Sequence, residues 1–169
     1  GRERPVLVHP GAQYGSKRWP ARRFGEVVRA LTRAGRRVLL TGTATERALA
    51  VEVARAGGLP EQHVLAGDTD IAALVALVAR AGLAVCGDTG IAHLASAFAV
   101  PSVVLFGPVG PEQWGPPAGG PHVTLTAPAA RRGDPFAADP DPALLAVTVD
   151  DVLAAADLVT RPAAAAPTP

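Results

Sequence analysis

The sequence is short of cysteine and of net charge, and each shortage excludes a class of function. Its single cysteine, Cys86, has no partner for an internal disulfide, and no Cys or His stands at the spacing of a zinc site. Sixteen basic and fifteen acidic side chains leave a net charge of +1, which is too small to bind nucleic acid or a membrane surface by bulk charge. We therefore expect no metal site, no redox pair and no nucleic-acid partner.

Long apolar runs are also lacking. No uncharged stretch reaches the ~18–20 apolar residues that a transmembrane segment needs, and residues 1–5 lack the apolar stretch of a secretion signal. We expect a cytoplasmic protein. A chain of 169 residues with 49% apolar side chains predicts one domain, over residues 1–160, followed by a disordered tail at 161–169.

The apolar residues that are present fall into short runs separated by helical patterns. This alternation predicts a Rossmann-like, doubly wound parallel sheet in a three-layer α/β/α domain with right-handed crossovers. The expected strands are residues 6–8, 37–41, 63–65, 83–86 and 102–106, with a possible edge strand at 122–126. The expected helices start at Pro20, after a cap at Thr45, after Thr69 or Asp70, at Ile91 and after Thr148.

Two later segments have no regular pattern. Nine of the fourteen residues in 107–120 are Gly or Pro, which predicts an ordered loop at a sheet edge where such folds bind ligands. Residues 127–142 contain four prolines and show no periodicity, so their structure is the least predictable.

The first candidate site is the loop that follows the first strand. It carries Lys17, the single lysine among sixteen basic residues, toward the start of a helix. Small residues and a helix N-terminus expose backbone N–H groups, and an ammonium adds a compact positive charge, so the loop fits an oxyanion. An ordinary loop with a solvated lysine fits the same residues.

The second candidate follows the fourth strand. Asp88, Thr89 and Gly90 open a small-residue helix, and His93 lies four residues after Thr89, so we expect it on about the same side. Carboxylate, hydroxyl, amide and imidazole groups together suit a phosphorylated sugar. The alternative is that Asp88 or Thr89 only caps the helix and that His93 is a half-buried structural histidine.

The third candidate is Glu46, in the first helical turn after the second strand. Its carboxylate could bind the two hydroxyls of a ribose, but the helix dipole favours glutamate there in any case, and spacing alone favours that simpler interpretation.

Familiar motifs of other enzymes are missing. There is no G-x-G-x-x-G after a strand, no P-loop and no G-x-S-x-G elbow. We interpret His9, His63 and His122 as structural, because none has a partner at recognisable spacing, and Cys86 as an inert core thiol. Tryptophans 19 and 114 could pack or could stack on a base.

Taken in order, these segments resemble one family. The matching stretches are residues 9–11, 17–20, 42–46, 66–71, 87–95 and 101–108. Together they resemble the C-terminal half of glycosyltransferase family 9, the ADP-heptose:lipopolysaccharide heptosyltransferases and their relatives, over about residues 6–115, with weaker similarity at 148–159. Residues 127–142 depart from the family, because the cysteines common there are absent.

The resemblance implies the donor-binding domain of a GT-B enzyme, in which two Rossmann-like domains face a cleft. The reaction would be metal-independent, need no cofactor and invert the anomeric carbon. The N-terminal acceptor domain of the same protein would carry the general base, so no catalytic residue is expected in this chain, which would be inactive in transfer alone.

The resemblance also implies a role for eight residues toward a nucleotide-diphosphate sugar, with an ADP-sugar favoured. They are Lys17 on the diphosphate, Glu46 on the ribose, Asp88 on the transferred sugar, Thr89, Gly90 and His93 on phosphates or adjoining hydroxyls, and Thr69 and Ile71 beside the base. Two other functions stay open: a sugar-nucleotide epimerase or phosphosugar enzyme, and a non-catalytic nucleotide-binding module.

Overall fold

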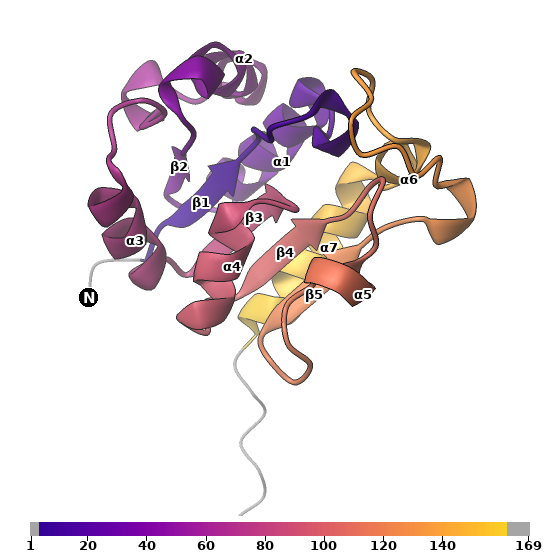
Figure 1. Cartoon of the computed structure of the whole chain (residues 1–169). Coiled ribbons are helices and arrows are strands. Elements are labelled where there is room, and N and C mark those ends of the chain that lie inside the picture. The colour runs from indigo at the N-terminus through magenta and orange to yellow at the C-terminus, as the bar shows by residue number, and fades with distance from the viewer. Residues whose placement is uncertain (1–3, 162–169) are drawn as a thin grey trace, which may run out of the picture.

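A computed structural model describes residues 4–161, which form a five-stranded parallel sheet with helices on both faces (Figure 1). The strands are β1 (Val6–His9), β2 (Val38–Leu40), β3 (Leu83–Gly87), β4 (Ser102–Leu105) and β5 (His122–Leu125). Their order is β2-β1-β3-β4-β5, and every neighbouring pair is parallel. The expected doubly wound parallel sheet is confirmed, including β5 at its edge.

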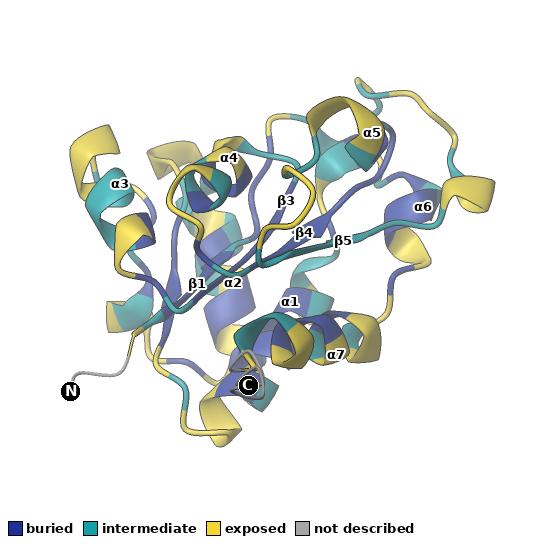
Figure 2. Ribbon diagram, turned by 90° about the horizontal axis from the view of Figure 1, so that it is seen from below, coloured by how far each residue is buried: buried dark blue, intermediate teal, exposed yellow. Residues whose placement is uncertain are grey.

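Five helices of eight or more residues cover the sheet. One face carries α1 (Ala21–Arg33), α2 (Arg47–Gly57) and α7 (Val149–Thr160), and the other carries α3 (Ile71–Ala79) and α4 (Gly90–Ala97). Figure 2 shows the buried strands between α1 and α7 on one side and α3 and α4 on the other.

The core divides into two layers because strand residues alternate between the faces. Val6 and Val8 pack with α1, α2 and α7, whereas Leu7 between them packs with α3 and α4. All three are fully buried, so both faces of β1 need apolar residues and the strand is a continuous apolar run.

Helices α1 and α2 approach each other closely at two glycines. A Cβ added to Gly25 would lie 2.5 Å from the Cβ of Ala56, and one added to Gly57 would lie 2.7 Å from Cγ1 of Val28. Only glycine fits at these two positions without displacing the facing helix.

The prediction of a strand at residues 63–65 is wrong. A 3₁₀ turn, η3 (Glu61–His63), occupies its start, and Val64 forms only an isolated parallel bridge to Leu40. The N–H groups of His63 and Val64 donate back to Pro60 O and Glu61 O, so they are not free to extend a ladder.

Three predicted helix starts also differ, and the smallest difference is that α4 begins at Gly90 and not at Ile91. The cap expected at Thr45 is instead at Thr43, which begins a 3₁₀ turn, η2 (Ala44–Glu46), ahead of α2. The hydroxyl of Thr43 and the Glu46 side chain form a capping box, a spacing that the sequence already contained. Pro20 is the N-cap of α1 and not its first helical residue.

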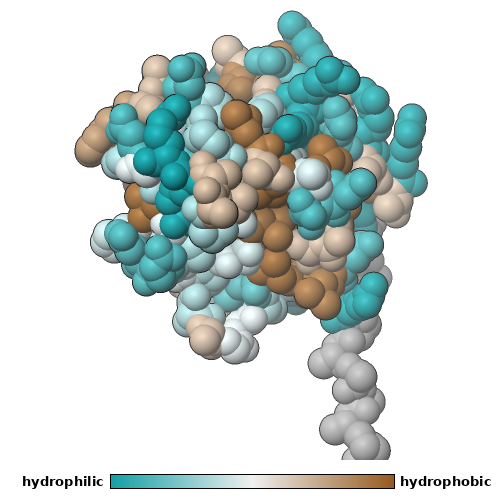
Figure 3. Space-filling model, turned by 90° about the vertical axis from the view of Figure 1, so that its right-hand side faces the viewer, coloured by the Kyte–Doolittle hydropathy of each residue, from teal (hydrophilic) through white to brown (hydrophobic). Residues whose placement is uncertain are grey.

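The irregular C-terminal part contains short helices. Helix α5 (Pro111–Trp114) interrupts the predicted loop at 107–120, and η4 (Pro128–Ala130) and α6 (Pro142–Leu145) lie at the two ends of the 127–142 segment. The edge strand β5 is half-buried, and Figure 3 shows apolar side chains gathered on this side of the molecule between hydrophilic ones.

The tail predicted to be disordered lies outside the described residues, apart from Arg161. No helix between Arg4 and Arg161 combines the length and the apolarity needed to cross a bilayer.

Candidate functional site

The site lies at the carboxyl edge of the sheet, between the loops that follow β1 and β3. From β1 the chain crosses to β2 on one side, while β3 lies on the other side, so this position is a topological switch point, where open α/β sheets bind ligands. A cavity of about 780 Å³ is found there. Its lining comes from the loops after β1, β2 and β3 and from α3 and α4. It includes five of the eight predicted site residues: Lys17, Glu46, Asp88, Thr89 and Gly90.

An ion pair connects the two loops across this cavity. Lys17 Nζ donates to Asp88 Oδ2 at 2.8 Å. The Lys17 side chain is 22% exposed and that of Asp88 9% exposed, so both charges are largely removed from water while the ammonium still reaches the cavity. An ammonium has three N–H donors, so Lys17 can hold Asp88 and bind an anion at the same time.

Backbone packing brings these two loops together. Lys17 is the last residue of a 3₁₀ turn, η1 (Gly15–Lys17), and its carbonyl oxygen lies 3.2 Å from the position that a Cβ on Gly87 would take. Glycine at the end of β3 therefore allows the lysine loop to lie directly against the residue that precedes Asp88.

The first turn of α4 faces the same cavity. Gly90 and Ile91 line it, and Thr89, the N-cap residue, makes no capping bond with its side chain. The Thr89 hydroxyl lies 3.5 Å from Gly87 O and donates toward it. By contrast, Asp70 caps α3 by accepting from Ala73 N at 2.7 Å. The N–H of Ala92 donates to Thr89 O, so the amides of α4 that are available to an anion beside the Lys17 ammonium are those of Gly90 and Ile91.

Glu46 borders the cavity from the β2 side and is held rigidly. Its Oε2 accepts from Thr43 N at 2.8 Å and from the Thr43 hydroxyl at 2.9 Å. A Cβ on Gly11 would lie 2.2 Å from Glu46 Oε1, so a side chain at position 11 would push this carboxylate out of its place. Glu46 therefore does form the capping box with Thr43, as the simpler interpretation predicts. The same hydrogen bonds also orient its carboxylate toward the cavity.

His9, for which the sequence predicts a structural role, lines the cavity. Its Nε2 lies 3.9 Å from Glu46 Oε2, and its Nδ1 bonds to the Thr41 hydroxyl at 3.1 Å. Burial lowers the pKa of His9, and the negative charge of Glu46 only partly opposes this effect. One feature of the sequence could have identified His9 as a site residue: it lies at the end of β1, and the other candidates follow strands that end at the same edge of the sheet.

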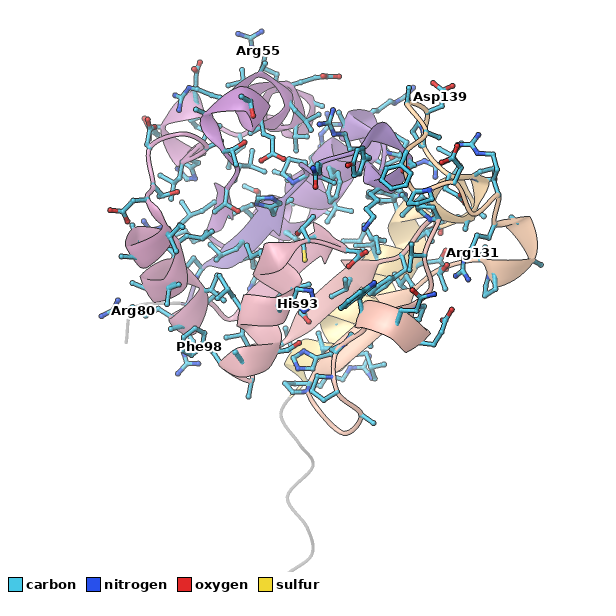
Figure 4. The ribbon with its side chains drawn as sticks, viewed as in Figure 1. Arg55, Arg80, His93, Phe98, Arg131 and Asp139 are labelled. Atoms are coloured by element: carbon cyan, nitrogen blue, oxygen red, sulfur yellow. The ribbon has the colours of Figure 1, made fainter. Side chains whose placement is uncertain are left out.

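His93 does not join Lys17 and Asp88, contrary to the expected spacing. It lies exposed on α4 (Figure 4). It does not line the cavity, whereas Leu94 does. The reason is that α4 begins at Gly90, so Thr89 lies outside the helix with extended backbone (φ −145°, ψ 172°) and helical spacing cannot be counted from it. A role for His93 toward phosphates or hydroxyls stays a prediction.

Thr69 and Ile71 lie at the start of α3, just outside the cavity lining. Ile71 is 81% exposed, and the cavity residue on this helix is Leu74, one turn further on. Their place beside a base also stays a prediction.

The remaining side chains considered from the sequence have structural partners. Cys86 is fully buried, and burial raises its pKa to about 12, which fits an inert thiol. His63 bonds to Val38 O, and His122 bonds to the Ser102 hydroxyl. Trp19 is buried and donates to Val147 O, so it packs in the core. Among residues 4–161, no group of three or more His, Cys, Asp or Glu side chains could hold a metal ion.

Comparison with known proteins decides the family. The sequence model of glycosyltransferase family 9 (heptosyltransferase) matches residues 2–128. The chain belongs to glycosyltransferase family 9. Lipopolysaccharide heptosyltransferase 2 of Salmonella typhimurium and that of Escherichia coli are each 35% identical to it over 115 residues, which are 65% of this chain and 33% of the relative.

Solved structures of this family share the fold. The E. coli ADP-heptose lipopolysaccharide heptosyltransferase II matches with a TM-score of 0.79 and 26% identity, over 95% of this chain and 47% of that one. A family 9 glycosyltransferase from Veillonella parvula gives a TM-score of 0.79 at 21% identity, over 94% and 47%. The structure of E. coli heptosyltransferase WaaC with ADP matches with a TM-score of 0.72 and 22% identity, over 90% of this chain and 43% of that one. The chain spans about a third of the curated relatives and about half of the solved ones.

Proposed function

We propose that this chain is the donor-binding half of an inverting, metal-independent, heptosyltransferase-like glycosyltransferase, and that the cavity takes a nucleotide-diphosphate sugar. The observation that carries the proposal is the arrangement of Lys17 and the first amides of α4 around one cavity at the switch point of the sheet. The family membership and the ADP or ADP-heptose named for solved relatives favour an ADP-sugar.

The diphosphate would lie between Lys17 and the N-terminus of α4. When a glycosyl bond to a nucleoside diphosphate breaks, negative charge builds on the departing phosphate. An ammonium and oriented amides stabilise that charge more strongly in the transition state than in the bound substrate. This cationic environment supports a metal-independent reaction. Asp88 would keep the ammonium in place and present its carboxylate edge to the transferred sugar.

The nucleoside would extend from the diphosphate toward β2 and α3. Glu46, oriented by Thr43, would accept from the ribose hydroxyls. Leu74 and Leu94 give this part of the cavity apolar walls suited to the face of a base, with Thr69 and Ile71 at its border.

In this proposal, the acceptor site and the general base are not among these 169 residues. They would be supplied by an N-terminal acceptor domain of the same protein, in agreement with the share of the solved relatives that the chain covers. A cytoplasmic location is part of the same proposal.

Isothermal titration calorimetry of the chain with ADP, UDP and GDP tests the proposal. We expect measurable binding of at least one nucleoside diphosphate, with ADP the tightest, and no sugar transfer by the chain alone. Absence of heat with all three would refute the proposed function. Turnover of a sugar nucleotide by the isolated chain would favour an epimerase or phosphosugar enzyme, because such an enzyme needs its acid and base within these residues.

A further inference from the structure

Ser16, the residue before Lys17, is fully buried and is bonded entirely to one distant segment. Its N–H donates to Ala137 O at 2.9 Å, and its hydroxyl donates to Pro135 O at 2.7 Å. Its carbonyl accepts from Asp141 N at 3.0 Å. Every polar group of this residue is therefore satisfied by residues 134–141, which we call the covering segment.

The covering segment is itself fixed by a buried carboxylate. Asp141 is 0% exposed, and its two oxygens accept from the backbone N–H groups of Arg132 (3.4 Å), Gly133 (3.1 Å) and Ala143 (2.9 Å). These bonds tie the segment to the start of α6. Buried charge–amide bonds of this kind hold a loop without regular secondary structure in one conformation.

The lysine loop is thus enclosed on two sides. A Cβ on Gly15 would lie 1.6 Å from Ala138 O, and the carbonyl of Lys17 lies against Gly87 on β3. In Figure 1 the orange covering segment lies beside the indigo loop that carries Lys17, and Figure 4 places Asp139 at the tip of the segment. Ser16 is the point at which the covering segment holds this loop.

We propose that Ser16 is a positioning residue: through it, the covering segment fixes the backbone of Lys17 so that the ammonium stays against Asp88 and points into the cavity. A lysine side chain has four rotatable bonds and loses much conformational entropy when its ammonium binds a ligand. A fixed backbone lets Asp88 hold the ammonium in place before the ligand arrives, which reduces that loss and raises affinity for the ligand. The consequence for ligand binding rests on the proposed function, but the geometric claim does not.

The chain contains a single lysine, which makes a direct test possible. Protein labelled with ¹³C,¹⁵N-lysine gives one side-chain signal in an NMR spectrum, and that signal reports on Lys17 alone. Asp88→Asn, which removes the charge partner, marks where the signal lies when the ion pair is lost. We expect Ser16→Ala to move the ligand-free signal from the wild-type position toward the Asp88→Asn position.

Ser96→Ala is the matched control. It removes a hydroxyl that also donates to a carbonyl, Ala92 O at 3.1 Å, but within α4 and outside the cavity lining. We expect the lysine signal of this variant to stay at the wild-type position. An unchanged signal in Ser16→Ala, alongside a shifted one in Asp88→Asn, would overturn the proposal. If Ser16→Ala does not fold, Asp141→Asn takes its place, since it weakens the carboxylate–amide bonds that fix the covering segment.

Ligand binding supplies a second readout. We expect Ser16→Ala to weaken the binding of ADP by about tenfold, which is the contribution of one buried hydrogen bond. The binding of adenosine should stay unchanged. In a Lys17→Ala background the same substitution should have no further effect on ADP, because its effect acts through the ammonium. Equal losses for ADP and adenosine would assign Ser16 a general structural role. Failure of the wild type to bind any nucleotide would refute the proposed function, while the ligand-free lysine signal would still decide the role of Ser16.

Discussion

Lys17 and Asp88 are separated by 71 positions in the sequence, yet their charged atoms are 2.8 Å apart at the point where the strand order reverses. Both side chains are largely buried. Removing either partner of such a pair leaves an uncompensated charge in a poorly solvated place. The pair therefore couples the two loops that border the cavity.

The first prediction concerns the ammonium. Lys17→Ala should weaken ADP binding by about 10- to 100-fold, the range for a lost hydrogen bond to a charged group, and should change adenosine binding little, because the ammonium acts on charge and not on the base. Calorimetry with both ligands measures the difference. Arg80→Ala, which removes an equal charge from the exposed end of α3 (Figure 4), is the control. Equal losses for the two ligands would contradict this role.

The second prediction concerns Glu46. If the carboxylate binds the ribose hydroxyls as proposed, the cavity should prefer ADP over 2′-deoxy-ADP, and Glu46→Ala should remove that preference. It should also lower the free energy of unfolding by about 0.3–1.5 kcal/mol, because the capping box with Thr43 is lost. Asp151→Ala breaks the equivalent capping box of α7, away from the cavity, and should destabilise the chain without changing the ligand preference. A preference that survives in Glu46→Ala would separate this residue from ribose binding.

The third prediction concerns pH. Burial holds the pKa of folded His9 below its ordinary value of 6.5, so the unfolded chain takes up a proton at higher pH than the folded chain does. The contribution of His9 to the free energy of unfolding should therefore be complete above about pH 6.5 and should fall as the pH falls below it. The slope for one group is at most about 1.4 kcal/mol per pH unit.

Urea unfolding at a series of pH values checks this. His9→Asn keeps a hydrogen-bonding group near the Thr41 hydroxyl but does not titrate. Its free energy of unfolding should fall less in acid than that of the wild type. Some sensitivity should remain, because burial also lowers the pKa of His122. Identical pH profiles for the wild type and His9→Asn would show that His9 does not titrate in this way.

The fourth prediction concerns the contact between α1 and α2. Replacing glycine by alanine inside a helix normally stabilises it by about 0.5–1 kcal/mol. Gly25→Ala should instead destabilise the chain by about 1–3 kcal/mol, since the new Cβ would lie 2.5 Å from that of Ala56. Denaturant unfolding measures the sign. Gly90→Ala, where the Cβ meets nothing within 4 Å, should not lower stability; a gain in Gly25→Ala would show that the helices separate freely.

The fold could be predicted from the sequence because apolar pattern and turn residues agree along most of the chain. Val6, Leu7 and Val8 are a continuous apolar run since both faces of β1 are covered. Prediction failed at residues 63–65, where the apolar pattern is that of a strand but the N–H groups are used by the preceding turn. A short apolar run does not reveal how its backbone hydrogen bonds are made.

The structure brings five of the eight candidate residues together, while their roles stay predictions. The cavity lining includes Lys17, Glu46, Asp88, Thr89 and Gly90, because all of them follow strands of one parallel sheet and so lie at one edge. His93 was misplaced because the expected spacing assumed that Thr89 was helical. His9 was missed because its partner Glu46 lies 37 positions away and has no sequence signal.

The sequence by itself determined the five strands of the sheet, but not the absence of one at residues 63–65, together with the sheet edge and the residue types there. These follow from local propensity and from the periodicity of apolar residues. Only the tertiary structure decided which polar groups meet. The pairing of Lys17 with Asp88 and the bonding of Ser16 to residues 134–141 depend on distances between loops that are far apart in the chain. Such distances are fixed by packing, here by the close approach that Gly15 and Gly87 allow, and no local pattern encodes them.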